Sequence, residues 1–293
     1  MNRSKLIGAT ALATVMTAGA ANAAMSVGGL AAGKLTDAGN GLGQSFSTNS
    51  LVVSYSDSLD NGMGISVGMS IYSTNILTGV NIDTGMGVIG LGSNQDSAAD
   101  KMDGSPACFS LNNCGAAELG GYDDGDSNAA GNSGNSIAYS NSMGGLSFKV
   151  TRGMESGLVD PIMSYAGSMS IMGATVKAGV TSIDYKAQGT ADKDPSFVTV
   201  GYSLAGLNLG YAMYDGDDGN EETQMGVGTS MGGYSMGIQF ASLDATTDKD
   251  QMEVSISKGM GAASFGLDYT EIDEAGGTAN DTEGWRFMYV IGF

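Results

Sequence analysis

The last nine residues of the chain alternate between two kinds of side chain. At the odd positions of residues 285–293 every side chain is aromatic or aliphatic, whereas the even positions include Arg286 and Gly292. Successive side chains of a β-strand point to opposite faces, so this period of two predicts a strand with one wholly apolar face. A tilted strand needs about nine to eleven residues to cross a membrane. The pattern therefore suggests a strand of a membrane barrel.

Similar alternating segments recur along most of the chain and are joined by glycine-containing turns. Ser-x-x-Gly turns lie at 142–145, 203–206 and 230–233, and Asp-Asn-Gly at 60–62 is a strong hairpin signal. The other ends of the hairpins carry longer acidic segments, such as 215–220, 244–250 and 273–282. Short turns at one end and long loops at the other are typical of a transmembrane β-barrel.

The fold class predicted from this pattern is all-β, an antiparallel transmembrane β-barrel. The sixteen expected strands are 25–35, 50–58, 63–72, 75–83, 86–93, 135–141, 146–152, 160–168, 173–184, 196–203, 207–214, 222–229, 234–243, 250–257, 262–271 and 284–293. The alternation is weakest at 75–83 and 86–93, and without these two segments the number is fourteen. Both numbers are even, as in bacterial outer-membrane barrels.

One segment, residues 94–134, interrupts the alternation for 41 residues. A loop of this length without strand character is usually functional in a compact domain. Its candidate channel-lining carboxylates are Asp96, Asp100, Asp103, Glu118, Asp123 and Asp124. Two interpretations remain open: clustered in a pore they would favour cations, and as solvated loop charge they would have no specific role. Both cysteines, Cys108 and Cys114, also lie here, and in an oxidising compartment we expect a small disulfide-closed loop rather than a metal site.

The N-terminus predicts export. Residues 1–23 combine Arg3 and Lys5 with an apolar stretch and an Ala-Asn-Ala cleavage site, so they are expected to be a signal peptide that leaves a mature barrel domain of residues 24–293. Later segments lack the roughly 18 uninterrupted apolar residues of a membrane helix. Removal of Arg3 and Lys5 leaves 10 basic and 31 acidic side chains, a net charge of −21. Such a surface repels nucleic acid and attracts cations.

Composition also argues against catalysis and against a cofactor. The chain contains no histidine, the residue that the known barrel proteases and phospholipases need as a base, so no enzyme activity is expected. Acidic runs such as Asp215, Asp217 and Asp218 lack the spacing of an EF-hand. They are interpreted as ordinary acidic turns, with weak external Ca²⁺ binding as the alternative.

The phase of the alternation predicts which residues face the lumen. If the apolar faces contact lipid, Arg286, Lys149 and Lys177 point inward, whereas Lys34 shares its phase with Leu30. A charge facing lipid at the midplane would cost about 2–4 kcal/mol, which favours the inward assignment. The basic residues either form one patch facing the acidic loop or lie at scattered depths. The same face carries Ser54, Ser66, Asn208, Gln224, Gln239, Glu253 and Asp268, and because it is otherwise mostly Gly, Ser or Ala we expect a wide, water-filled bore.

Several of these features together resemble the general porins of Gram-negative bacteria, in particular the alphaproteobacterial type. The resemblance rests on Asn-Ser-Ile-Ala-Tyr at 135–139, the turn at 142–145 with Leu-Ser-Phe at 146–148, Leu-Asp-Asn-Gly at 59–62, and the terminal Phe293. It implies a sixteen-stranded barrel, usually a homotrimer, whose third external loop folds into the lumen opposite basic wall residues. It also implies that Phe293 is the signal read by the barrel-assembly machinery.

The function expected from sequence is passive diffusion of small hydrophilic solutes and ions across the outer membrane, with a preference for cations. In this interpretation the 94–134 loop constricts the bore, and its acids oppose Lys34, Lys149, Lys177 and Arg286. The alternative is a structural or adhesive barrel in the outer-membrane lipid, whose external loops bind a partner and which has no open pore.

Overall fold

The computed structural model describes residues 24–37, 42–71, 76–93, 95, 97–109, 136–154, 160–186, 190–275 and 282–292. Within these ranges no helix is long and apolar enough to cross a membrane. The same ranges contain sixteen antiparallel strands: β1 (Ala24–Asp37), β2 (Leu42–Ser58), β3 (Gly64–Ile71), β4 (Ile76–Asp83), β5 (Val88–Gly92), β6 (Ser136–Met143), β7 (Leu146–Gly153), β8 (Met163–Ile171), β9 (Ala174–Ser182), β10 (Ser196–Leu204), β11 (Leu207–Asp215), β12 (Glu221–Met231), β13 (Tyr234–Asp244), β14 (Lys249–Met260), β15 (Ala263–Glu274) and β16 (Thr282–Gly292).

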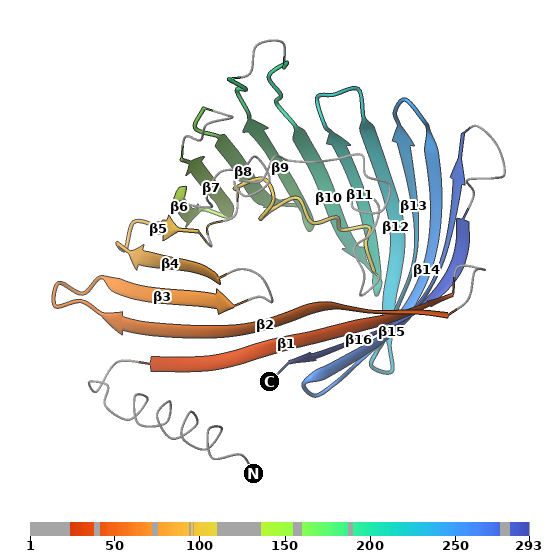
Figure 1. Ribbon diagram of the computed structural model, residues 1–293, viewed down its shortest axis with the longest axis horizontal. Helices are drawn as coiled ribbons and strands as arrows, with labels where there is room; N and C mark the ends of the chain where they lie inside the picture. The colour runs from red at the N-terminus through yellow and green to blue at the C-terminus, as the bar shows by residue number, and fades with distance from the viewer. Residues whose placement is uncertain are drawn as a thin grey trace.

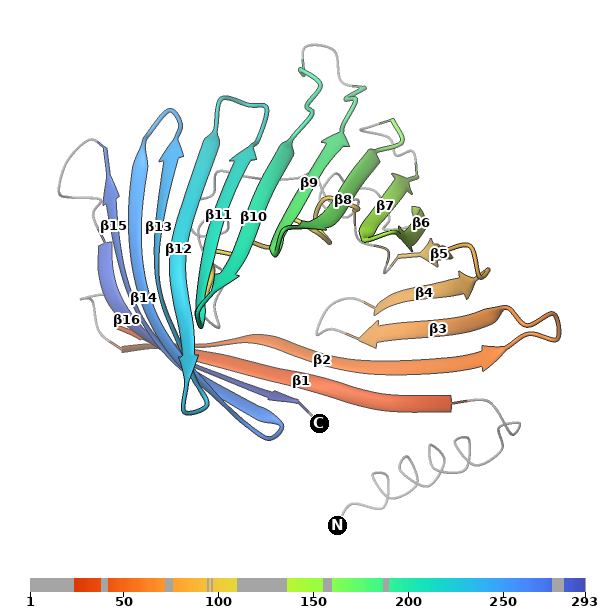
Figure 2. The same ribbon diagram turned by 180° about the vertical axis from the view of Figure 1, so that it is seen from behind.

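The strands form one closed barrel in which each strand pairs with its neighbours in sequence (Figures 1 and 2). Closure is made by β1 and β16, whose register runs from Leu30 opposite Gly292 to Asp37 opposite Trp285. The prediction of sixteen strands is confirmed, including the two weakest, β4 and β5. The signal peptide predicted at 1–23 and the terminal Phe293 lie outside the described residues.

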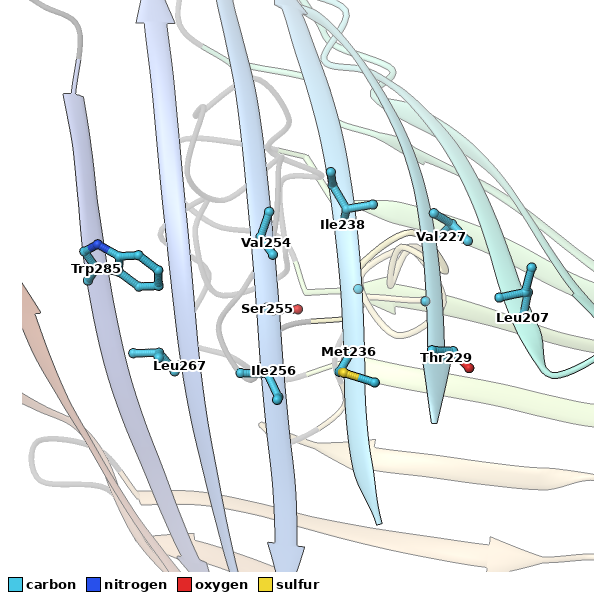
Figure 3. Close-up of a pocket in the computed structure, with 12 residues that line it drawn as sticks. Leu207, Val227, Thr229, Met236, Ile238, Val254, Ser255, Ile256, Leu267 and Trp285 are labelled. Atoms are coloured by element: carbon cyan, nitrogen blue, oxygen red, sulfur yellow. The ribbon is translucent and has the colours of Figure 1, made fainter. Parts of the chain in front are cut away.

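The barrel has an apolar outer face and a polar inner face, as the alternation predicted. On β11, Tyr211 and Met213 are 41% and 46% exposed, whereas Ala212 between them is fully buried. Figure 3 shows the outer face of β12–β16, where Val227, Ile238 and Val254 project to one side. Because lipid tails solvate these side chains, their exposure to the surroundings of the barrel is favourable.

The two-residue turns, such as 144–145, 205–206 and 232–233, all lie at one end of the barrel and explain the Ser-x-x-Gly motif. Gly144 and Gly145 have φ values of 62° and 86°, the left-handed conformations that a two-residue hairpin turn requires. The serine of each motif hydrogen-bonds across its hairpin to the fifth residue after it, at Ser142–Ser147 (2.8 Å), Ser203–Asn208 (2.7 Å) and Ser230–Ser235 (3.3 Å). The serine therefore fixes the last inward-facing pair before each turn.

The strands extend further at the loop end than the hydrophobic pattern indicated. β2 begins at Leu42, eight residues before the expected start, and the acidic residues Asp244 and Glu274 belong to β13 and β15 rather than to loops. Backbone ladder hydrogen bonds continue in water beyond the apolar band, so a strand does not end where its lipid-facing pattern ends. β8 shows the opposite difference, because it begins at Met163 rather than at residue 160.

The seam between β1 and β16 contains a glycine beneath an aromatic ring. Gly33 of β1 lies opposite Tyr289 of β16, at an irregularity in the pairing of β1 with β2. A Cβ atom at Gly33 would lie 2.5 Å from Tyr289 Oη, which is closer than van der Waals contact allows.

We therefore expect Gly33→Val to lower the free energy of unfolding of the detergent-folded barrel by about 1–3 kcal/mol, the usual cost of overpacking. Urea unfolding followed by tryptophan fluorescence measures the change. Gly167→Val is the matched control, because Gly167 lies on the outer face of β8 and its Cβ would have only ordinary contacts, the nearest at 3.5 Å. Equal stability of the two variants would contradict this account of the seam.

Candidate functional site in the barrel lumen

Residues 97–109 lie inside the barrel against the inner wall of β8–β13. The backbone N–H of Ala99 donates to Ser164 Oγ at 2.9 Å, and Lys177 Nζ donates to the carbonyl of Gly104 at 3.2 Å. Tyr214 Oη donates to the carbonyl of Asp103 at 2.8 Å. These three side chains come from the lumen faces of β8, β9 and β11, and Figure 1 shows the yellow segment crossing in front of this wall. The described part of the third external loop therefore folds into the lumen, as the resemblance implied.

The start of this segment folds into a tight turn that is stabilised locally. The Asp100 N–H donates to Ser97 Oγ at 2.9 Å, and the Lys101 N–H donates to the Ser97 carbonyl at 3.2 Å. Serine at the start of a turn commonly satisfies backbone donors in this way. The turn presents Ala98, Ala99 and Met102 to a small apolar cluster on the wall, made of Ala166, Phe197, Ala212 and Tyr214.

The end of the segment lies on glycines of β10–β13. We call Gly201, Gly210, Gly226, Gly228 and Gly237 the glycine track. A Cβ at Gly201 would lie 3.0 Å from Pro106, and one at Gly226 would lie 2.5 Å from the carbonyl oxygen of Ala107. At Gly210 it would overlap the backbone of Pro106 and Ala107, and at Gly228 and Gly237 it would overlap the ring of Phe109. Only glycine permits so close an approach of another backbone.

The glycine track corrects the expectation of a wide bore at this wall. Inward glycines were expected to leave open, water-filled space, but those of β10–β13 accommodate the loop instead. The alternation pattern identified the inward face correctly. It could not show that a segment about 100 residues earlier in the chain fills that face.

A charged cluster lies on the lumen side of β14–β16. Arg286 Nη2 donates to Glu253 Oε2 and to Thr270 Oγ1, each at 2.7 Å. Glu253 is 2% exposed and the side chain of Arg286 is 12% exposed, so this ion pair is well shielded from solvent. Asp268 pairs directly with Arg286 in the β15–β16 register and is fully buried, as is Glu222 on β12.

The predicted basic residues occupy different parts of the lumen wall. Lys177 contacts the loop, whereas the described part of the structure pairs Arg286 with Glu253 of the neighbouring wall. Lys149 lies on the inner face of β7, opposite Ala166. Lys34 lies opposite Met288 on β16. Met288 is buried and adjoins the outward-facing Phe287, so both Met288 and Lys34 belong to the inward face. The structure therefore shows Lys177 against the described loop segment.

The acidic candidates are only partly described. Asp100 is exposed on the turn, and Asp103 is half-buried beside Tyr214. Asp96, Glu118, Asp123 and Asp124 lie outside the described residues, so their eyelet role stays a prediction. Sequence reasoning did not assign a role to Glu222, to Ser164 or to Tyr214. The alternation pattern would have placed all three side chains inward. The sequence around an inward residue does not indicate whether that residue contacts the loop.

Cys108 is disulfide-bonded and adjoins the residues that lie on the glycine track. Cys114, the other cysteine of the chain, lies outside the described residues, so the pairing of the two stays a prediction.

The acidic turn after β11 is hydrogen-bonded to the loop that precedes β10. Asp217 Oδ2 accepts from the Asp194 N–H and Asp218 Oδ2 from Lys193 Nζ, both at 2.7 Å, while Asp215 Oδ1 accepts from the Asp217 N–H at 2.8 Å. In the described ranges no three acidic, cysteine or histidine side chains are grouped so as to hold a metal ion. Weak Ca²⁺ binding at this turn stays a prediction.

An apolar groove of about 600 Å³ lies on the outer face of β11–β16 and is flanked by Leu207 and Trp285 (Figure 3). Along each strand the large apolar side chains of the groove alternate with the residues that point into the lumen. The groove therefore faces the membrane rather than the channel. The site that bears on solute passage is therefore the lumen, with its inserted loop.

A closed barrel with an apolar outer face and a loop folded against its inner wall defines an outer-membrane channel protein. A family model described as Gram-negative porin matches residues 8–290. The chain therefore belongs to the Gram-negative porin family, and it forms a water-filled channel of the outer membrane for passive diffusion of small hydrophilic solutes.

Solved structures show the same fold at low sequence identity. A double mutant of the Rhodopseudomonas blastica porin is 16% identical, with a TM-score of 0.70, and the match covers 92% of this chain and 100% of that chain. OmpT of Vibrio cholerae, expressed in the outer membrane, is 12% identical, with a TM-score of 0.71 over 94% of this chain and 99% of that chain. No curated protein matches the chain in sequence. The expected resemblance to alphaproteobacterial porins is confirmed.

We expect Gly210→Val to displace the loop, because its side chain would occupy the space of the Pro106–Ala107 backbone. Residues 105–109 would move away from the wall into the passage. In planar bilayers the variant should show a lower unit conductance and noisier open-channel current than the unaltered protein.

Gly259→Val is the matched control, because Gly259 faces the lumen on β14 and its Cβ would lie 3.9 Å from Ser264 Oγ, an ordinary van der Waals contact. This control should keep the conductance of the unaltered protein. Indistinguishable current traces from the Gly210 and Gly259 variants would show that the loop does not depend on the glycine track.

Proposed function

We propose that this porin prefers cations and that the inserted loop sets its size limit. The observation that carries the proposal is the charge balance on the lumen face of β12–β16. Four acidic residues lie on the inward phase of these strands, Glu222, Glu253, Asp268 and Glu274, against two basic ones, Lys249 and Arg286. Arg286 binds Glu253 at 2.7 Å, and Lys249 lies 3.9 Å from Glu274. Carboxylates that outnumber basic groups on a pore wall lower the energy of a passing cation relative to an anion.

The size limit follows from what occupies the bore. Residues 97–109 are attached to the wall by hydrogen bonds from three strands and by apolar packing at Ala98 and Ala99. A segment held at several points acts as a fixed partition, so it narrows the passage without closing it. We propose that the remainder of the 94–134 loop completes this constriction, with its acids as eyelet carboxylates.

Ion selectivity is tested by the zero-current potential across a planar bilayer with a KCl gradient. We expect the sign that indicates preferred passage of K⁺. Asp268→Asn removes a negative charge and should reduce this potential, whereas Arg286→Gln removes a positive charge and should increase it. Arg286→Lys preserves the charge and is the control.

A zero-current potential of the sign that indicates preferred passage of Cl⁻ would refute the cation preference. Potentials that do not change in opposite directions in the two charge variants would refute the role of this wall. Channels must first be shown to insert, because a membrane without conductance would instead argue against the pore itself.

We also propose that the chain assembles as a homotrimer in outer-membrane lipid. A solved structure of Vibrio cholerae OmpT is described as a trimer form, and it matches 93% of this chain with a TM-score of 0.70. Insertion would be guided by the barrel-assembly machinery through Phe293. Native mass spectrometry of protein extracted in mild detergent should give three times the mass of one chain, and a single-chain mass would exclude the trimer.

Membership of the porin family supports a channel rather than an enzyme. We propose that transport needs no cofactor, and that any Ca²⁺ held by Asp215, Asp217 and Asp218 is external to the conduction path.

A further inference from the structure

A pocket of about 350 Å³ lies between the inserted loop and the wall of β9–β11. Pro106 and Phe109 of the loop form one side, and Thr175, Lys177, Thr199 and Asn208 are among the residues that form the other. Thr175 and Asn208 are close to the short turns at 172–173 and 205–206, so the pocket lies near the short-turn end of the lumen, which is the periplasmic end of such barrels. Volumes of about 300–1,000 Å³ are typical of small-molecule sites.

The electrostatics of this pocket differ from those of the rest of the protein. Lys177 is the one charged side chain among the described residues that line it, although the mature chain carries a net charge of −21. Lys177 Nζ is held in place by the carbonyl of Gly104 at 3.2 Å. An ammonium group has three donors, so further donors remain for an anionic group of a solute.

The neighbouring wall supplies hydrogen-bonding groups that the described protein does not use. Thr199 lies directly opposite Lys177 in the β9–β10 register, is 1% exposed, and its Oγ1 makes no hydrogen bond. A buried hydroxyl normally has a partner, so this one is available to a polar group that enters the pocket. Asn208 accepts from Ser203 through Oδ1 at 2.7 Å, and no described protein group accepts from its Nδ2.

The loop side of the pocket is apolar. Phe109 is held with its ring against Gly228 and Gly237, and Pro106 covers Gly201. This rigid surface suits the C–H face of a compact solute, while the wall opposite suits hydroxyls and an anion. A solute with one carboxylate and several hydroxyls matches all three parts of the site.

We propose that this pocket is a binding station for small hydroxylated carboxylates, such as sugar acids, on their way through the channel. The carboxylate pairs with Lys177, hydroxyls bond to Thr199 and Asn208, and the carbon chain lies on Phe109. The station gives an anionic solute one favourable position in a channel that otherwise prefers cations. It rests on the proposed pore function, since binding matters only to a solute that enters.

The test is single-channel recording in KCl with potassium gluconate added, compared with sorbitol and with acetate. Sorbitol carries the hydroxyls without the charge, and acetate carries the charge without the hydroxyls. We expect brief, concentration-dependent interruptions of the current with gluconate, and far fewer with the other two. Lys177→Gln should weaken the apparent gluconate affinity about tenfold or more, the loss expected for one charge-assisted hydrogen bond.

Thr199→Val keeps the shape of the side chain and should weaken gluconate binding severalfold, so it tests the site even if the lysine variant folds poorly. Lys258→Gln is the control for loss of one positive charge, because Lys258 packs over the ring of Tyr234, away from the pocket. Ohmic channels without gluconate interruptions would overturn the station and leave the pore intact. Equal interruption by sorbitol would overturn the carboxylate assignment, and a membrane without conductance would overturn the pore function itself.

Discussion

In the hydrocarbon core of a membrane, backbone groups have no water to bond. Each unpaired N–H or C=O costs several kcal/mol there, so a sheet in lipid must close on itself. In this chain the requirement is met by eight residue pairs between β1 and β16, from Leu30–Gly292 to Asp37–Trp285. The terminal strand is therefore the element on which closure depends, and the fit of Tyr289 over Gly33 belongs to that seam.

Closure creates a lumen, and the lumen allows a second type of packing. The outer face must be apolar, but the inner face contacts water, the inserted loop, or both. At β8–β13 the inner face combines an apolar cluster, three hydrogen bonds to the loop and the glycine track. At β14–β16 the inner face instead carries the Arg286–Glu253 ion pair beside Asp268. The channel is thus divided between a wall that holds the loop and a wall that carries charge.

Much of the fold was predictable from the sequence, because alternation with a period of two is a local property. It located all sixteen strands and assigned Arg286, Glu253 and Asp268 to the lumen. The limits of β2 were wrong because ladder hydrogen bonds extend beyond the lipid-facing pattern.

The contacts inside the lumen were not predictable in the same way. That Arg286 binds Glu253, and that Pro106 to Phe109 lie on glycines of β10–β13, depends on the register and curvature of strands far apart in sequence. An inward-facing glycine gives the same sequence pattern whether it contacts water or the backbone of another segment. Sequence pattern alone therefore could not distinguish an open wall from an occupied one.

The loop contacts also imply an order of assembly. The bonds from Ala99 to Ser164, from Lys177 to Gly104 and from Tyr214 to Asp103 join residues 65, 73 and 111 positions apart. Contacts between distant residues form only after the chain has met the entropic cost of closing the intervening loop. The wall that residues 97–109 contact exists only after β8–β13 have paired with one another. The narrowing of the passage therefore follows the pairing of these strands and is a maturation step separate from their formation.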